Sequence, residues 1–259
     1  MFSTHLYIPV PYTFYKNFGL LQAEVNKYPN LSPIYGAPRI SNDEWLIMLG
    51  DVWSGSYSKQ FDTAWLASHA IAALINMVEQ GLALSTAMSG IVSSSDNCHD
   101  YSLIDCKGDG KPGFYAYKGF NQLANTTRIS TTGHDHMNFA AIAGKNDSGI
   151  IVVVSNYDVK TYLNKYEPQK SGDNKNPSWL EYNAYVSQFG EPKVYNKFNL
   201  TLNNLPWTSS QKIAYERYLV DDSHKLELAE SQTLSGSKEM KFSEDIAAPS
   251  VQVIKLTAK

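Results

Sequence analysis

The pattern of apolar residues changes once along this chain, close to Asn125. Before that point, short apolar runs alternate with stretches of helical periodicity. The strand-like runs are 2–8, 45–49 and 82–88, and the helical stretches are 12–28, 62–80 and 114–124. Strands that alternate with helices form a parallel sheet covered by helices. The first half therefore predicts three strand–helix units, which are too few to close an eight-stranded barrel, although a chain of 259 residues has the length of one.

After Asn125 the pattern changes to a period of two, with turn residues between short segments. The strand-like segments are 139–143, 150–155, 194–202, 213–220, 225–229, 238–243 and 251–256, with an exposed loop at 172–177. Short strands at regular spacing are typical of an antiparallel sandwich. We therefore predict an α/β plus all-β fold with two domains: a partial barrel-like β/α domain, 1–128, and a β-sandwich, 129–259.

The charge balance excludes several classes of protein. The chain has 22 Lys and Arg against 25 Asp and Glu, without a basic run, which argues against a nucleic-acid partner. No apolar run reaches the roughly 18 residues of a membrane span, so we expect no membrane partner. The first residues, MFSTHLYIPV, have neither the basic nor the apolar region of a signal peptide, and the compartment stays open.

Five stretches of the sequence occur in the order found in one enzyme family. They are FSTHLYIP (2–9), DVWSGSYSKQFDTAWLASHAIAAL (51–74), DGKPGFYAYKGFNQL (109–123), YERYLVDDSHKLELA (215–229) and SVQVIKL (250–256). In this order they resemble the C-terminal part of glycoside hydrolase family 39, which includes β-xylosidases and α-L-iduronidases. That family carries a clan A (β/α)8 barrel followed by a β-sandwich. The resemblance spans nearly the whole chain and implies about strands six to eight of the barrel plus the sandwich.

The resemblance implies an activity, and it also implies that one of the two catalytic carboxyl groups is not in this sequence. It implies hydrolysis of β-linked xylosides or related plant oligosaccharides with retention, and a carbohydrate partner; an extracellular location is compatible with it. Retaining enzymes use two carboxyl groups about 5–5.5 Å apart, one as nucleophile and one as acid/base. The acid/base Glu of the family follows an Asn at the end of the fourth strand, so this chain does not contain it.

The nucleophile is expected after the apolar run 45–49. An ungapped alignment with the family motif Glu-Trp-Asn-Ser-Ser-Tyr places Val52 at that position, and one inserted residue places Asp51 there. An Asp carboxylate is shorter by one methylene, and a displacement of that size can cost about a hundredfold in rate. Asp51 as a turn-capping residue is the alternative. Glu44 is the other candidate, but it precedes the apolar run and is expected at the wrong end of that strand.

Four further side chains are candidates for the sugar pocket. His5 and Tyr7 stand at the end of the first strand, where the family has a pocket His and a Tyr that hydrogen-bonds the nucleophile. Trp53 and Tyr57 offer rings that could stack on sugar C–H faces. For all four, ordinary packing is the competing interpretation.

Two pairs of residues have spacings that suggest a disulfide in one case and a metal site in the other. Cys98 and Cys106 lie in one polar loop and either form a disulfide or stay free thiols. His134 and His136 have the spacing of a metal pair, but a third ligand at a set spacing is missing, and a polar strand edge is the simpler interpretation. We therefore predict no metal and no cofactor.

A second function fits the same sequence. The chain is then a catalytically degenerate carbohydrate-binding or interaction protein. An uncovered edge of a partial parallel sheet tends to associate. We therefore expect either a homo-oligomer or a complex with a complementary N-terminal polypeptide.

Overall fold

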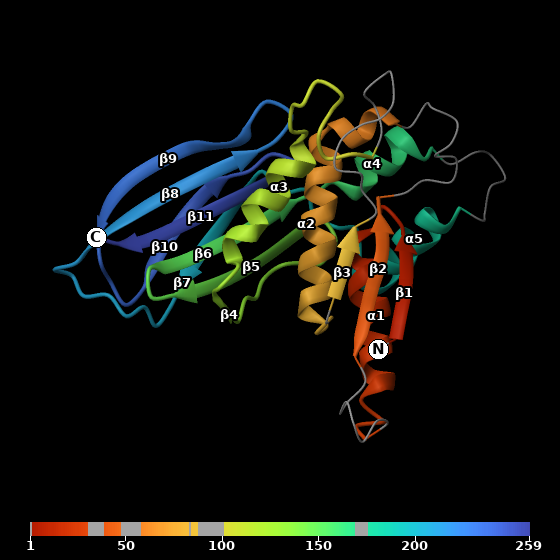
Figure 1. Cartoon of the computed structure of the whole chain (residues 1–259), viewed down its shortest axis with the longest axis horizontal. Coiled ribbons are helices and arrows are strands. Elements are labelled where there is room, and N and C mark those ends of the chain that lie inside the picture. Colours follow the sequence, from red (N-terminus) through yellow and green to blue (C-terminus); the bar gives the residue numbers. More distant parts are fainter. Residues whose placement is uncertain (1, 31–38, 48–57, 83, 88–100, 169–175) are drawn as a thin grey trace.

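The computed structural model describes residues 2–30, 39–47, 58–82, 84–87, 101–168 and 176–259. Within these residues the chain is a mixed α/β fold with three sheets and five α-helices (Figure 1). None of the described helices is long and apolar enough to span a membrane.

The first sheet is parallel and has three strands in the order β1-β2-β3. These strands are β1 (Phe2–Tyr7), β2 (Ile40–Leu46) and β3 (Leu84–Ala87). Helix α1 (Pro11–Val25) packs on one face of the sheet, where the ring of Phe14 meets the ring of Trp45 edge to face at 5.8 Å. This face of the sheet belongs to the largest buried cluster of the fold.

Helix α2 (Ala64–Glu79) lies between the first sheet and the second one (Figure 1). Its N-terminus is capped by Thr63, whose hydroxyl accepts from the amide of Trp65, and by Asp222, which accepts from the amide of Ala64 at 2.6 Å. Almost every residue of the helix is buried, because both sides are covered by protein. Helix α3 (Pro112–Phe120) packs beside α2 and continues into the 3-10 turn Asn121–Leu123.

The second sheet is antiparallel, with six strands in the order β4-β5-β6-β11-β8-β9. The strands are β4 (Thr127–Ile129), β5 (Phe139–Asn146), β6 (Gly149–Asn156), β8 (Lys212–Val220), β9 (Lys225–Ser235) and β11 (Ser250–Ala258). Val153 and Val253 face α2 and α3 on one side. On the other side, Ile254 packs with Phe198 and Met240, which come from β7 (Lys197–Leu202) and β10 (Met240–Asp245), the antiparallel pair of the third sheet. Both faces of the six-stranded sheet are therefore covered.

Two helices were not predicted. They are α4 (Val159–Tyr166) and α5 (Pro177–Phe189), and both pack into the cluster around α1. Asp158 caps the first by accepting from the amide of Thr161, and Asn176 caps the second by accepting from the amide of Ser178. The exposed loop predicted at 172–177 lies mostly outside the described residues, and its last residue begins α5. The expectation of strands alone in this half is wrong.

Strand β2 also differs from the prediction. It covers Ile40–Leu46 and starts five residues before the apolar run that we took as the strand. Ser41 and Asn42 are fully buried and pair with β1 and β3, so the polar start of the strand was hidden from the apolar pattern. The predicted division at 128/129 falls inside β4 and stays a prediction.

Candidate functional site

One face of the three-stranded sheet, which we call the open face, is exposed. Its exposed residues are Ser3, His5, Asp43, Leu84 and Thr86. The neighbours Thr4, Trp45 and Ser85 are more buried, and Trp45 donates from its indole nitrogen to the Ser85 hydroxyl at 2.6 Å on the helix side. On β1 and β3, alternation turns these side chains away from α1 and α2. In β2 the register shifts between Asn42 and Trp45, so Asp43 is exposed although Trp45, two residues later, is buried on the helix side.

Two carboxylates flank an imidazole on this face. His5 Nε2 lies 3.6 Å from Asp43 Oδ1, and His5 Nδ1 lies 3.8 Å from Glu44 Oε2. The register pairs His5 with Glu44 and shifts between Thr4 and His5, which brings both acidic residues next to one ring. The three side chains are 39–52% exposed, so water screens their charges.

The pKa of Asp43 is lowered from its ordinary value. The Ser3 hydroxyl donates to its carboxylate and lowers the pKa, and His5 lowers it further. The Thr86 hydroxyl donates to the backbone carbonyl of Asp43 at 2.8 Å and ties β3 to β2. The open face thus presents an ionised carboxylate at neutral pH.

The structure brings some of the predicted pocket residues together. Tyr7 meets the ring of His5 edge to face at 6.5 Å and is half-buried against the core. Glu44 is the fifth residue of β2, not a residue before the strand, so the expectation that it lies at the N-terminal end is wrong. Buried polar residues extend the strand backwards past Glu44.

The remaining predicted site residues are Asp51, Trp53 and Tyr57, and all three lie outside the described residues. Cys106 is disulfide-bonded. The sequence has one other cysteine, Cys98, which also lies outside them.

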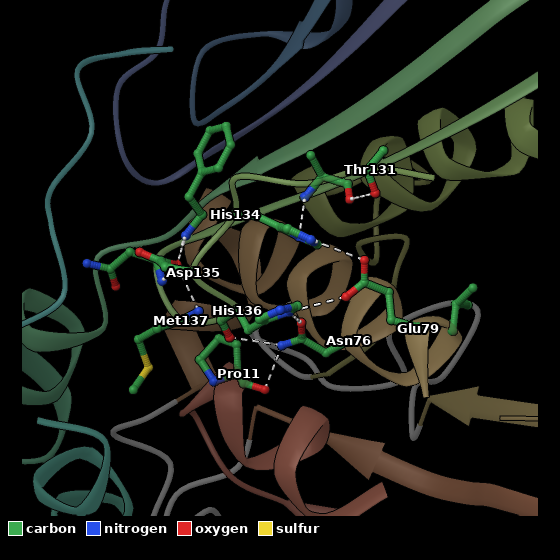
Figure 2. Close-up of polar contacts among 12 residues, drawn as sticks. Pro11, Asn76, Glu79, Thr131, His134, Asp135, His136 and Met137 are labelled. Atoms are coloured by element: carbon green, nitrogen blue, oxygen red, sulfur yellow. Dashed lines mark hydrogen bonds and ion pairs between the residues drawn. The ribbon is translucent and has the colours of Figure 1, made fainter. Parts of the chain in front are cut away.

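A second cluster joins a helix end to a loop (Figure 2). Glu79, the last residue of α2, points one carboxylate oxygen at each of two imidazoles: Oε1 lies 3.2 Å from His134 Nε2, and Oε2 lies 3.3 Å from His136 Nδ1. The side chain of Glu79 is 15% exposed, that of His134 is 7% exposed, and that of His136 is 20% exposed. The sequence placed the two histidines together but gave no signal for Glu79, because only the packing of α2 brings it there.

Burial shifts the pKa values in this cluster. It raises the pKa of Glu79 to about 7, which the nearby Arg128 partly opposes. It lowers the pKa of His136 to about 4 and lowers that of His134 as well. Both imidazoles are therefore neutral at neutral pH.

The cluster opens onto a cleft of about 610 Å³. Its walls are the cluster itself, Tyr15 from α1, and the segment 128–133. Figure 1 shows α2 running opposite to β2 and β3, so the C-terminal end of α2 lies toward the end of the parallel sheet where the strands begin. Met77, near that end of the helix, contacts the side-chain amide of Asn42 near the start of β2, and Glu79 is the last residue of the helix. The open face and this cleft are therefore separate candidate sites.

Comparison with known proteins gives a fold. No family model matches the sequence, and no curated protein matches it. Among solved structures, a glucosidase from Croceicoccus marinus matches 98% of this chain and 53% of its own, with 20% identity and a TM-score of 0.71.

Two further glycosidase structures are similar to the chain. A monomeric β-xylosidase from Caulobacter crescentus matches 96% of this chain and 50% of its own, at 13% identity and a TM-score of 0.59. The GH39 enzyme from Xanthomonas axonopodis pv. citri matches 94% of this chain and 48% of its own, at 9% identity and a TM-score of 0.59. The chain has a glycoside hydrolase-like fold and spans about half the length of these proteins.

Proposed function

We propose that this chain is the C-terminal part of a retaining glycoside hydrolase that acts on β-linked xylosides or related plant oligosaccharides. The observation that carries the proposal is the similarity of fold along 98% of the chain to a glucosidase. Fold similarity with a β-xylosidase and with a family 39 enzyme supports the substrate class. In this proposal the parallel sheet corresponds to about strands six to eight of a (β/α)8 barrel, and the other two sheets form the sandwich.

The open face then turns toward the interior of the completed barrel, and sugar binds where its strands end. Asp51 follows β2 and is our first candidate for the nucleophile; Glu44 is the second, since it lies inside β2 beside His5. The nucleophile's carboxylate oxygen attacks the anomeric carbon while the glycosidic C–O bond breaks. Water then cleaves the glycosyl ester and releases the sugar with retained configuration.

The pocket residues follow from the same arrangement. His5 and Tyr7 line the glycone site, and Trp53 and Tyr57 stack on the sugar. In this proposal the acid/base carboxyl comes from a preceding N-terminal segment or from a complementary polypeptide that pairs with the sheet. Within the described part of the chain, β1 and β3 each have a strand on one side only, which supports such pairing.

An activated substrate tests the proposal without the missing acid. Dinitrophenolate leaves without protonation, so the nucleophile alone releases it from a 2,4-dinitrophenyl β-xyloside or β-glucoside. We expect release by the purified chain, and at least a hundredfold loss in Asp51→Ala or, if the second candidate acts, in Glu44→Gln. Asp245→Asn, an exposed carboxylate on β10, is the control. Equal rates in all variants would refute both assignments.

Among the described strands, β1 and β3 each pair on one side only, which also favours the second candidate function. Here the chain binds carbohydrate without cleaving it and associates through the parallel sheet. Sugar binding by calorimetry, without release of dinitrophenolate, and a concentration-dependent oligomer in analytical ultracentrifugation are the expected results. A monodisperse monomer would contradict association through the edge.

A further inference from the structure

The spacing of the Glu79 cluster is compatible with a metal site. Zinc binds imidazole nitrogen and carboxylate oxygen at about 2.0–2.2 Å, which places neighbouring ligand atoms of a tetrahedron about 3.3 Å apart. Glu79 Oε1 lies 3.2 Å from His134 Nε2, and its other oxygen, Oε2, lies 3.3 Å from His136 Nδ1. The ligand atoms of all three residues lie within 4.8 Å of one another. A cation would therefore fit between them with small movements of the side chains.

Surrounding residues hold His136 in place. Asn76 accepts from His136 Nδ1 at 3.0 Å and donates from Nδ2 to the backbone carbonyls of Pro11 and His136, at 2.8 and 2.9 Å. Tyr15 stacks on the imidazole with ring centroids 3.9 Å apart. The backbone of His136 is in the left-handed region, with φ of 59°. This is an uncommon conformation for a residue other than glycine, and it points to a side chain whose position is constrained.

The loop that carries the histidines is tied down as well. The Asp135 carboxylate oxygen Oδ1 accepts from the amides of Met137, Asn138 and Phe139 at 2.8–2.9 Å. Figure 2 shows Asp135 turned away from Glu79, while both imidazoles turn toward it. Asp135 thus orders the loop, and Glu79 supplies the carboxylate.

The protons balance without a charged imidazole. In the metal-free arrangement His134 Nδ1 accepts from the amide of Ala141 at 3.5 Å, so its proton is on Nε2 and faces Glu79. The proton of His136 is on Nδ1 and faces Asn76. When a cation binds at these two nitrogens, each ring stays neutral and moves its proton to its other nitrogen. His134 then gives up the long contact with Ala141, and His136 gives up its hydrogen bond to Asn76 Oδ1, while Asn76 still donates to the backbone carbonyls of Pro11 and His136.

We propose that Glu79, His134 and His136 bind a divalent transition-metal ion, with zinc as the ion that best fits the donors. Two imidazoles and one carboxylate are a zinc-type ligand set, and the cleft leaves a fourth position for water. Mg²⁺ and Ca²⁺ prefer sites made of oxygen ligands and fit poorly here. The bound ion would link the end of α2 to the loop between β4 and β5, away from the strand ends where sugar is proposed to bind.

Thermal unfolding with and without metal tests the site. Chelator-treated protein should gain stability with ZnCl2 and not with MgCl2 or CaCl2. At a free Zn²⁺ concentration of about 100 times Kd, the unfolding equilibrium shifts about a hundredfold, which raises Tm by about 5–10 °C. Glu79→Gln, His134→Gln and His136→Gln should each lose the shift. His5→Gln and His224→Gln, which alter other His–carboxylate pairs, should keep it.

A spectroscopic readout covers variants that fold poorly. Co²⁺ at a tetrahedral site absorbs visible light far more strongly than Co²⁺ in water, so a one-to-one titration of the wild-type chain should give this absorption, and Zn²⁺ should abolish it by displacement. A wild-type chain with neither the absorption nor a zinc-dependent Tm would overturn the proposal. Retention of both signals in Glu79→Gln would also overturn it.

Discussion

Among the described residues, the six-stranded sheet is covered on both faces, whereas the three-stranded sheet is covered on one. Helices α2 and α3 pack on one side of the large sheet and the β7–β10 pair packs on the other. The small sheet has α1 and α2 on one side, and its open face carries His5, Asp43 and Glu44. Polar and ionised side chains on a sheet face favour a ligand or partner that is itself polar, and a sugar has this character. The difference separates a region that stabilises the fold from one that is available for binding.

The largest difference between the two sheets should appear on truncation of an aliphatic side chain. Ile254 on β11 is fully buried, so Ile254→Ala should lower the free energy of unfolding by about 2–5 kcal/mol. Leu84 on β3 is 49% exposed, so Leu84→Ala should change it by less than about 0.5 kcal/mol. Urea unfolding measures both. A loss at Leu84 as large as that at Ile254 would mean that the open face is covered in the native protein.

Charged groups sharpen the same contrast. Glu244 accepts from the Tyr215 hydroxyl at 2.6 Å and pairs with Arg217 Nε at 2.9 Å, and its side chain is 7% exposed. Glu244→Ala leaves the buried Tyr215 hydroxyl without its acceptor and leaves Arg217 with Glu230 alone, and it should cost about 3 kcal/mol in urea unfolding. The neighbouring Asp245 pairs with Lys197 at the surface, so Asp245→Ala should cost at most about 0.5 kcal/mol. Equal losses in the two variants would show that burial does not determine how much each ion pair contributes to the free energy of unfolding.

A buried histidine on the covered side of the three-stranded sheet should make the free energy of unfolding depend on pH. His69 on α2 is fully buried, its Nε2 lies 2.8 Å from the carbonyl oxygen of Ile8, and burial lowers its pKa to about 3. The unfolded chain protonates this group below a pH of about 6.5 while the folded chain does not. Stability should therefore fall by about 1.4 kcal/mol per pH unit between about 6 and 3. The measured slope should decrease by that amount in His69→Gln; an unchanged slope would contradict the burial of a neutral ring.

The smallest effect on stability is expected on the open face. Glu44 is 39% exposed and lies 3.8 Å from His5, so Glu44→Gln should change the free energy of unfolding by less than about 0.5 kcal/mol. Asp43→Asn is the matched change on the adjacent residue. A large loss in either variant would show that these carboxylates hold the fold together and would weaken the case for a binding role.

Much of the fold could be predicted because local patterns determine it. Apolar residues at helical spacing identified α1 and α2, and the run IIVVVS identified β6. Helix α4 was missed because it has only eight residues and buries only three of them, Val159, Tyr162 and Leu163. Helix α5 was missed because its large buried side chains are aromatic, and in both helices a capping residue is the main local signal. The start of β2 was missed because two polar residues are buried there. For α4 and α5, packing against the core decides the structure, and for the start of β2, pairing with β1 and β3 decides it. Neither can be read from the pattern of apolar residues.

The candidate sites were harder to predict than the fold. His5 and Glu44 were chosen on resemblance and position, but their closeness depends on the shift of register between β1 and β2. The pairing of His134 and His136 with Glu79 depends on where α2 ends against a loop more than 50 residues later in the sequence. Sequence spacing can indicate the two histidines but not a ligand that only packing supplies.

A covalent trap tests the central claim, that a carboxylate at the end of the parallel sheet attacks a sugar. The chain is incubated with 2,4-dinitrophenyl 2-deoxy-2-fluoro-β-xyloside, whose fluorine slows hydrolysis of the glycosyl ester, and its intact mass is measured. The account predicts one fluorosugar per chain, mapped by peptide analysis to Asp51 or, as the second candidate, to Glu44. An absent adduct, or one that persists in both Asp51→Ala and Glu44→Gln, would contradict it.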